Sequence, residues 1–352
     1  MFAALGGCVF FCMTFTVSAD LSHVSGLHQS LPFLGWKGKD YCDGSDWTYT
    51  KPQCAKQGDM ATTKEASEWD SKYKQCGDNL QSPIKISFMQ TSFKNFEPIQ
   101  FSGYDVPFTF FVENGGNALY ITPQEADLES YGGPLSVRYN LSKAVFHFGN
   151  GTGHGSEHKI DNEIFAAELQ LLISSEKPTS GSCFLKGNGV AIFVILFKCS
   201  RFQQRSQSNP WLDPFINATD NLQYRGNWTK MVMPLSHFLP STTLDYYLYA
   251  GSLTFPPCTS GITVIVFSTP VPIGDSQLMK LRGNLVVYVN NCKNVVYGNL
   301  RETRNLSNRV VYRSFKFIDT SGATVVVGSS VNKVVWMTLW TLSVFLRYTL
   351  GR

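Results

Sequence analysis

The side chains best suited to metal or proton chemistry gather in one stretch of the chain, residues 143–173. It contains His147, Glu168 and Gln170, which supply an imidazole, a carboxylate and an amide. Imidazole and carboxylate groups are common ligands of zinc, and a catalytic zinc needs three protein ligands and a water molecule. What these groups can do together depends on the elements that carry them.

Both ends of this stretch alternate between apolar and polar residues, as half-buried strands do. At the first end Val145 and His147 share a face, and at the last end Glu168 and Gln170 share one. Two neighbouring strands with these faces inward would bring all four side chains onto one surface, which we call the floor of the candidate site.

The block resembles an α-class carbonic anhydrase. That family places three zinc-binding histidines on two adjacent strands, two as His-x-His and the third as Glu-x-His, with Gly-Ser-Glu-His between them. This chain has Gly-Ser-Glu-His at residues 155–158, but its three ligand positions hold Val145, His147 and Gln170. The spacing fits the family without a gap.

The resemblance therefore predicts a zinc site with two of its three ligands replaced. Val145 cannot ligate a metal, and the neutral amide of Gln170 is a poor zinc ligand. Without zinc there is no water with a pKa near 7 to attack carbon dioxide. We expect no metal cofactor, and we interpret the chain as a non-enzyme built on an enzyme's fold.

Other positions carry over from the same resemblance. Glu157 and Thr254 match the residues that handle the proton of zinc hydroxide in active relatives. Gly116 stands where a proton-shuttling histidine commonly follows Asn-Gly. The pocket positions that the resemblance implies are Asn114, Lys143, Glu168, Leu172, Leu253 and Phe255, the last in place of a threonine beside the substrate space.

The remaining polar groups also have a structural interpretation. Glu157 and Thr254 are expected to form a satisfied buried pair. Gln170 can donate its amide N–H to Glu168, which keeps a buried carboxylate satisfied. We expect His158 to be packed in the core and His154 to be exposed.

The wider chain agrees with the resemblance. Family motifs occur in order at residues 81–84 (Gln-Ser-Pro-Ile), 132–135 (Gly-Gly-Pro-Leu) and 251–254 (Gly-Ser-Leu-Thr). The implied fold is α+β but mostly β, with a large twisted, predominantly antiparallel sheet and short peripheral helices. We place this domain at residues 46–318.

Residues 1–19 read as a secretory signal, an apolar run that ends in Val-Ser-Ala, and residues 20–45 as a leader. The chain has 352 residues and a formal net charge of +4, without a basic cluster, so we expect no nucleic-acid partner. The predicted location is the secretory pathway and the extracellular face of the plasma membrane.

Cysteines and glycosylation sequons fit secretion. The resemblance implies a disulfide between Cys76 and Cys258, and Cys42 with Cys54 is a candidate for a second one. The pairing of Cys183, Cys199 and Cys292 is left open. Five N-glycosylation sequons are present, at Asn140, Asn150, Asn217, Asn227 and Asn305.

The tail, residues 319–352, is predicted to attach the protein to a membrane. Its apolar run of thirteen residues, 334–346, is shorter than the ~20 residues that a spanning helix needs. Ser321 or Gly322, a spacer and this run resemble a GPI-attachment signal, as in type IV-like, membrane-anchored carbonic anhydrases. A transmembrane anchor is the alternative.

Two functions remain. The first is a catalytically silent cell-surface ectodomain that binds an extracellular or cell-surface partner, as a binding or adhesion scaffold. The second is a carbonate dehydratase, which hydrates carbon dioxide to bicarbonate through an unusual zinc site.

Overall fold

The computed structural model describes residues 49, 66–125, 127–175, 189–199, 208–284, 286–289, 292–295 and 298–316. The chain divides into two units, Met1–Ser314 and Phe315–Arg352, and every element below belongs to the first. The predicted signal peptide, leader, Cys42–Cys54 pair and GPI sites lie outside the described residues.

Strands are the main regular secondary structure of the described chain. Their bounds are β1 Lys85–Ile86, β2 Ser92–Phe93, β3 Ile99–Ser102, β4 Pro107–Asn114, β5 Leu119–Pro123, β6 Glu129–Gly132, β7 Leu135–Phe148, β8 Lys159–Ile160, β9 Glu163–Ile164, β10 Ala167–Ser174, β11 Val190–Lys198, β12 Trp228–Pro234, β13 Tyr246–Ser252, β14 Ser260–Phe267, β15 Val271–Pro272, β16 Val286–Val289, β17 Cys292–Val295 and β18 Tyr312–Arg313.

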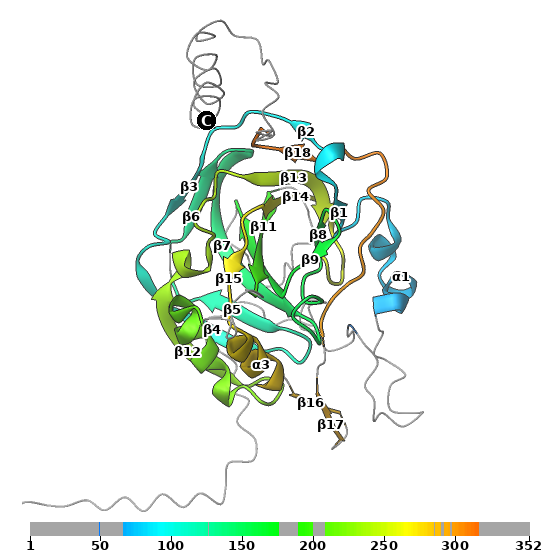
Figure 1. The fold of residues 1–352 in the computed structure, drawn as a ribbon. Helices are drawn as coiled ribbons and strands as arrows, with labels where there is room; N and C mark the ends of the chain where they lie inside the picture. The colour runs from blue at the N-terminus through cyan, green and yellow to red at the C-terminus, as the bar shows by residue number, and fades with distance from the viewer. Residues whose placement is uncertain are drawn as a thin grey trace, which may run out of the picture. The chain divides into compact units, whose positions relative to one another are not determined.

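Thirteen of these strands form one large curved sheet (Figure 1). Its main path runs β12-β4-β5-β7-β10-β11-β14-β13-β18-β2. Neighbours in this sheet run antiparallel, except that β11 lies parallel to β14 and β15, and β18 lies parallel to β2. The predicted large, mostly antiparallel sheet is confirmed.

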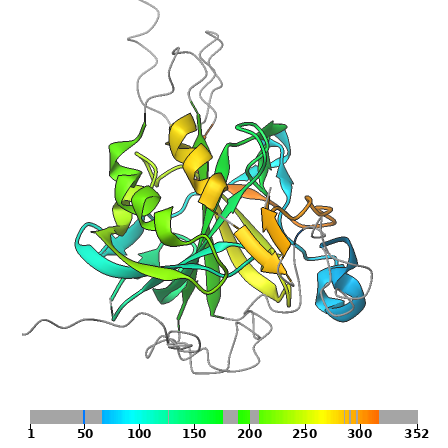
Figure 2. The same cartoon turned by 90° about the horizontal axis from the view of Figure 1, so that it is seen from below.

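The helices are short and lie at the edges of the sheet (Figure 1). The α-helices are α1 Trp69–Lys72, α2 Asp213–Ala218 and α3 Asp275–Asn284, and the 3-10 helices are Ala66–Glu68, Lys74–Gly77, Phe88–Gln90, Pro210–Leu212, Thr219–Asn221 and Leu235–Phe238. Helices α2 and α3 contact each other (Figure 2). Among the described residues, no helix is long and apolar enough to cross a membrane.

The central strand β11 shows why the sheet has two covered faces. Its sequence is an almost unbroken apolar run, and all of its residues except Lys198 are buried. Such a run is typical of a strand covered on both sides. One face carries the main hydrophobic core, which includes Phe146, Leu169 and Phe193. The residues that alternate with these, including His147 and Gln170, therefore occupy the opposite face.

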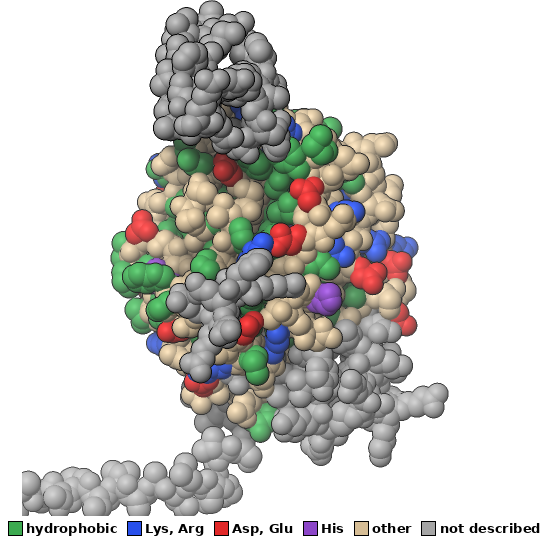
Figure 3. Space-filling model, viewed as in Figure 1, with side chains coloured by type: hydrophobic (Ala, Val, Ile, Leu, Met, Phe, Trp, Pro, Cys, Tyr) green, Lys and Arg blue, Asp and Glu red, His purple; other side chains and the backbone are tan. Residues whose placement is uncertain are grey.

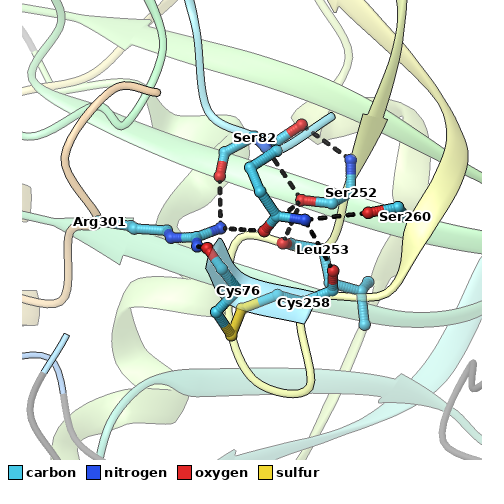
Figure 4. The surroundings of a disulfide bond; sticks show 8 residues. Cys76, Ser82, Ser252, Leu253, Cys258, Ser260 and Arg301 are labelled. Carbon is cyan, nitrogen blue, oxygen red and sulfur yellow. Dashed lines mark hydrogen bonds between the residues drawn. A yellow bond between two sulfur atoms is a disulfide. The ribbon is translucent and has the colours of Figure 1, made fainter. Parts of the chain in front are cut away.

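A disulfide joins the N-terminal segment to the loop after β13 (Figure 4). Cys76 and Cys258 are bonded at an S–S distance of 2.04 Å, across a sequence separation of 182. The guanidinium of Arg301 donates hydrogen bonds to the carbonyls of Cys76 (2.9 Å) and Ser82 (2.7 Å) and to Gln81 Oε1 (2.9 Å). The predicted Cys76–Cys258 bridge is confirmed, and a buried arginine reinforces it.

We predict that Cys76→Ala combined with Cys258→Ala lowers the free energy of unfolding by about 2–5 kcal/mol, since the bridge closes a long loop of the unfolded chain. The measurement is guanidinium denaturation of both proteins without reductant. An unchanged denaturation midpoint would contradict the prediction.

Candidate functional site

The site is built on the pairing of β7 with β10. In the register of these antiparallel strands, Val145 lies opposite Gln170 and His147 lies opposite Glu168. All four residues are buried. The floor predicted from the alternation of the two strands is present.

His147 is held by the backbone of a distant segment. Its Nδ1 lies 2.9 Å from the carbonyl oxygen of Asn299, which can only accept, so Nδ1 carries the proton. The Asn299 amide is itself fixed, because it donates to Phe146 O at 2.9 Å and accepts from Phe148 N at 2.8 Å. Burial lowers the pKa of His147, which favours the neutral imidazole.

The other ring nitrogen of His147 is left with a lone pair. Within the part of the chain that the structure describes, Nε2 is buried and has no hydrogen-bond partner. The ring of Tyr49 packs edge-on against the imidazole, with 6.0 Å between ring centroids. An imidazole with one unprotonated nitrogen is also the form that can bind a metal.

Glu168 is the charged centre of the site. Its carboxylate accepts hydrogen bonds from the backbone N–H of Glu157 (3.0 Å) and His158 (2.8 Å), and from His158 Nδ1 (2.8 Å). Burial alone would raise the pKa of Glu168, but the charge and hydrogen bonds of His158 outweigh it and hold the pKa below its usual value. Glu168 is therefore ionised.

His158 is a packed core residue, as expected. Its Nε2 lies 2.7 Å from the hydroxyl of Tyr249, which also contacts Ser82 Oγ at 2.8 Å. His154, by contrast, is exposed, as predicted. The contact with Tyr249 was not predicted, because the two residues are 91 positions apart in the chain.

Gln170 bridges two carboxyl groups through a single amide nitrogen. Its Nε2 donates to Glu168 Oε1 at 2.9 Å, as expected, and also to Glu157 Oε2 at 2.8 Å. Its Oε1 accepts from the Thr254 hydroxyl at 3.2 Å. Both amide hydrogens and the carbonyl oxygen of Gln170 are thus engaged inside the protein.

Glu157 is the second carboxyl group. Its Oε1 accepts from the backbone N–H of Arg301 at 2.8 Å. Burial, followed by the charge of Glu168, raises the pKa of Glu157 to about 8, while the hydrogen bond from the Arg301 backbone opposes the shift. Two carboxyl groups this close in a low dielectric do not ionise together easily, so Glu157 retains its proton near neutral pH.

The predicted pocket positions differ in burial. Leu172, Leu253 and Phe255 are fully or almost fully buried. Lys143 is half-buried, with its ammonium 4.5 Å from the centroid of the Tyr120 ring, and desolvation lowers its pKa. These residues offer apolar side chains and one cation.

Asn114 and Gly116 serve the turn between β4 and β5. Asn114 Nδ2 donates to Leu222 O, and Asn114 Oδ1 accepts from Gly116 N, both at 2.8 Å. Gly116 has φ +89°, and a Cβ there would lie 2.8 Å from the Arg225 side chain. A histidine at Gly116 would therefore be strained as well as crowded.

Comparison with known proteins places this chain in a family. The family model described as eukaryotic-type carbonic anhydrase matches residues 64–315. The chain belongs to this carbonic anhydrase family. The match lies inside the domain predicted at residues 46–318.

Individual relatives agree. The chain is similar to carbonic anhydrase 12 of Homo sapiens, with 30% identity over 80% of this chain and 76% of the relative. It is 29% identical to carbonic anhydrase 1 of Mus musculus, over 70% of this chain and 94% of the relative. It is also 29% identical to carbonic anhydrase 3 of Rattus norvegicus, over 74% of this chain and the whole relative.

A metal centre needs several ligands that converge. Among the described residues, no group of three or more His, Cys, Asp or Glu side chains is placed to hold a metal ion. The floor of the site supplies one imidazole, one aliphatic side chain, one amide and one carboxylate, and the amide and the carboxylate are hydrogen-bonded to each other.

Glu157 should make stability depend on pH. Because the folded protein raises the pKa of Glu157, the protonated side chain contributes to stability. This contribution is complete below the ordinary pKa of 4.5 and is lost as pH rises through about 8. Between pH 6.5 and 8 we expect the free energy of unfolding to fall by about 1–2 kcal/mol from this group. The lowered pKa of His147 makes stability rise with pH around the ordinary value of 6.5, so at the lower end of this window it partly opposes the effect of Glu157.

The measurement is urea denaturation at several pH values in this window. Glu157→Gln removes the titrating group, so we expect the free energy of unfolding of this variant to fall less steeply with pH than that of the unmodified protein. The slope is the readout, because the substitution also changes absolute stability. Parallel profiles for the two proteins would refute the role of Glu157.

Proposed function

We propose that this member of the carbonic anhydrase family is a catalytically silent extracellular domain that binds a partner, as a cell-surface scaffold. The observation that carries the proposal is the position of Gln170. It stands at the third ligand position of the family motif, and its amide is bonded to Glu157, Glu168 and Thr254.

The residues at the ligand positions do not fit a catalytic zinc. Val145 has no ligating atom, and the Gln170 amide nitrogen has no lone pair available for a metal. Gln170 Oε1 is a neutral oxygen that already accepts a hydrogen bond from Thr254. His147 alone falls short of the three ligands that a catalytic zinc requires.

The proton-handling groups support the same conclusion. In this chain the Thr254 hydroxyl donates a hydrogen bond to Gln170 Oε1, and Glu157 accepts a hydrogen bond from Gln170 Nε2. Both residues are thus used to satisfy Gln170. Gly116 has no titratable group with which to carry a proton out of the site.

Carbonate dehydratase activity is the second candidate, favoured by one observation. The Nε2 lone pair of His147 is unpartnered among the described residues, as a metal ligand's would be. That function needs two further ligands from elsewhere in the chain.

The extracellular location rests on sequence features, namely the signal at residues 1–19, the five sequons and the tail with Ser321 or Gly322. On the face drawn in Figure 3, acidic and basic side chains of the described residues are interspersed. Such a surface lacks the concentrated positive charge that nucleic-acid binding uses. An extracellular or cell-surface partner and membrane attachment through the tail fit better.

The decisive measurement is the zinc content of the purified full-length protein after dialysis against metal-free buffer, together with a carbon dioxide hydration assay. We expect well below one zinc per chain and no rate above the uncatalysed reaction. A stable value near one, with hydration, would establish the second candidate instead.

A matched variant tests whether the ligand positions are the cause. Val145→His with Gln170→His restores three histidines on the paired strands, and we expect zinc binding close to one per chain. Gln170→Asn, which stays neutral, is the control and should bind no zinc. Failure of the double variant to bind zinc while folded would show that more than the ligands has changed.

A further inference from the structure

A polar cleft lies between the N-terminal segment and the C-terminal part of the domain. Its volume is about 360 Å³, and its lining includes Asp78, Asn79, Thr303, Arg304, Asn305 and Ser307. A hydrogen bond from Ser307 Oγ to Asn79 O, 3.3 Å long, links its two sides. The cleft is separate from the buried site around Gln170.

One of the lining residues is a glycosylation acceptor. Asn305, Leu306 and Ser307 form a sequon, and Asn305 is exposed. A sugar attached to Asn305 Nδ2 would begin within a cleft of the protein itself. This distinguishes Asn305 from an acceptor on an open loop.

The cleft carries groups that recognise a sugar. Carboxylate, amide and guanidinium groups supply acceptors and donors for hydroxyl and acetamido groups. In the part of the chain that the structure describes, the side chains of Asp78, Asn79 and Arg304 make no hydrogen bond or ion pair. Their polar groups are available to a ligand.

We propose that an N-linked glycan at Asn305 seats its first N-acetylglucosamine in this cleft and ties residues 77–79 to residues 303–307. The inference rests on the extracellular location in the proposed function, because only a chain in the secretory pathway receives this glycan. The sugar would add non-covalent contacts where Arg301 already binds the carbonyl of Cys76.

Other sequons lie in different surroundings. Asn217 Oδ1 accepts from Lys280 Nζ at 3.0 Å, and Asn227 Oδ1 accepts from Tyr224 N at 2.9 Å. Asn150 is exposed on a loop, and a Cβ on the next residue, Gly151, would meet no atom within 4 Å. A glycan at Asn150 would therefore project into solvent, which makes this position a matched control.

The experiment compares full-length protein carrying high-mannose glycans before and after endoglycosidase H, which leaves a single N-acetylglucosamine on each acceptor. Mass spectrometry establishes which acceptors are occupied. Thermal unfolding and backbone hydrogen exchange are then measured for both forms, and for Asn305→Gln and Asn150→Gln.

We expect the trimmed protein to have the same melting temperature as the untrimmed protein, and the same slow backbone hydrogen exchange at residues 77–79. Asn305→Gln should melt on the order of 2 °C lower, with faster exchange there. Asn150→Gln should change neither. Asp78→Ala with Asn79→Ala, which keeps the glycan and alters only exposed side chains, should exchange as fast as Asn305→Gln.

Two results would overturn the inference alone: an occupied Asn305 whose substitution leaves exchange unchanged, or an unoccupied Asn305 in a chain glycosylated at Asn150. Absence of glycan from all five sequons would overturn the extracellular location as well, so the two failures are distinguishable.

Discussion

The arrangement of the site depends on two buried carboxyl groups that share one amide. Glu157 and Glu168 both accept from Gln170 Nε2, at 2.8 and 2.9 Å. Two unscreened negative charges so close in a protein interior would repel strongly. The pair is stable because backbone N–H groups and His158 keep Glu168 ionised, while Glu157 holds a proton. The neutral amide of Gln170 donates one hydrogen bond to the protonated Glu157 and one to the ionised Glu168, and so adds no charge to the site.

This arrangement explains how glutamine is tolerated at residue 170, the position where the family resemblance implies a zinc-binding histidine. A buried polar group that loses its partner costs about 1–3 kcal/mol. Glu168 would lose a hydrogen-bond donor if Gln170 were replaced by an apolar residue, and because Glu168 is fully buried, solvent could not take the donor's place. Glutamine supplies the donor that Glu168 needs, and its second N–H and its carbonyl oxygen find Glu157 and Thr254.

The floor and the main hydrophobic core lie on opposite faces of the sheet. The hydrophobic core lies on the other face of β7 and β10, where Phe146, Leu169 and Leu171 are buried. Because the two faces of the sheet alternate residue by residue, one face can change its chemistry while the other retains its packing.

The sequence by itself determined the family, the mostly β fold, the two strands of the site, the residues on their shared floor and the Cys76–Cys258 partners. The strands and their floor follow from the alternation along β7 and β10, which is local in the chain. The family and its fold follow from motifs in a fixed order, and the resemblance to the family implied the disulfide partners. Only the tertiary structure decided that Gln170 donates to Glu157 as well as to Glu168. It also brought together the hydrogen-bonded pairs His147 with Asn299, His158 with Tyr249, and Arg301 with the carbonyl of Cys76. The last three contacts join residues 91 to 225 positions apart. No local pattern encodes them, because they form only when the fold brings distant segments together.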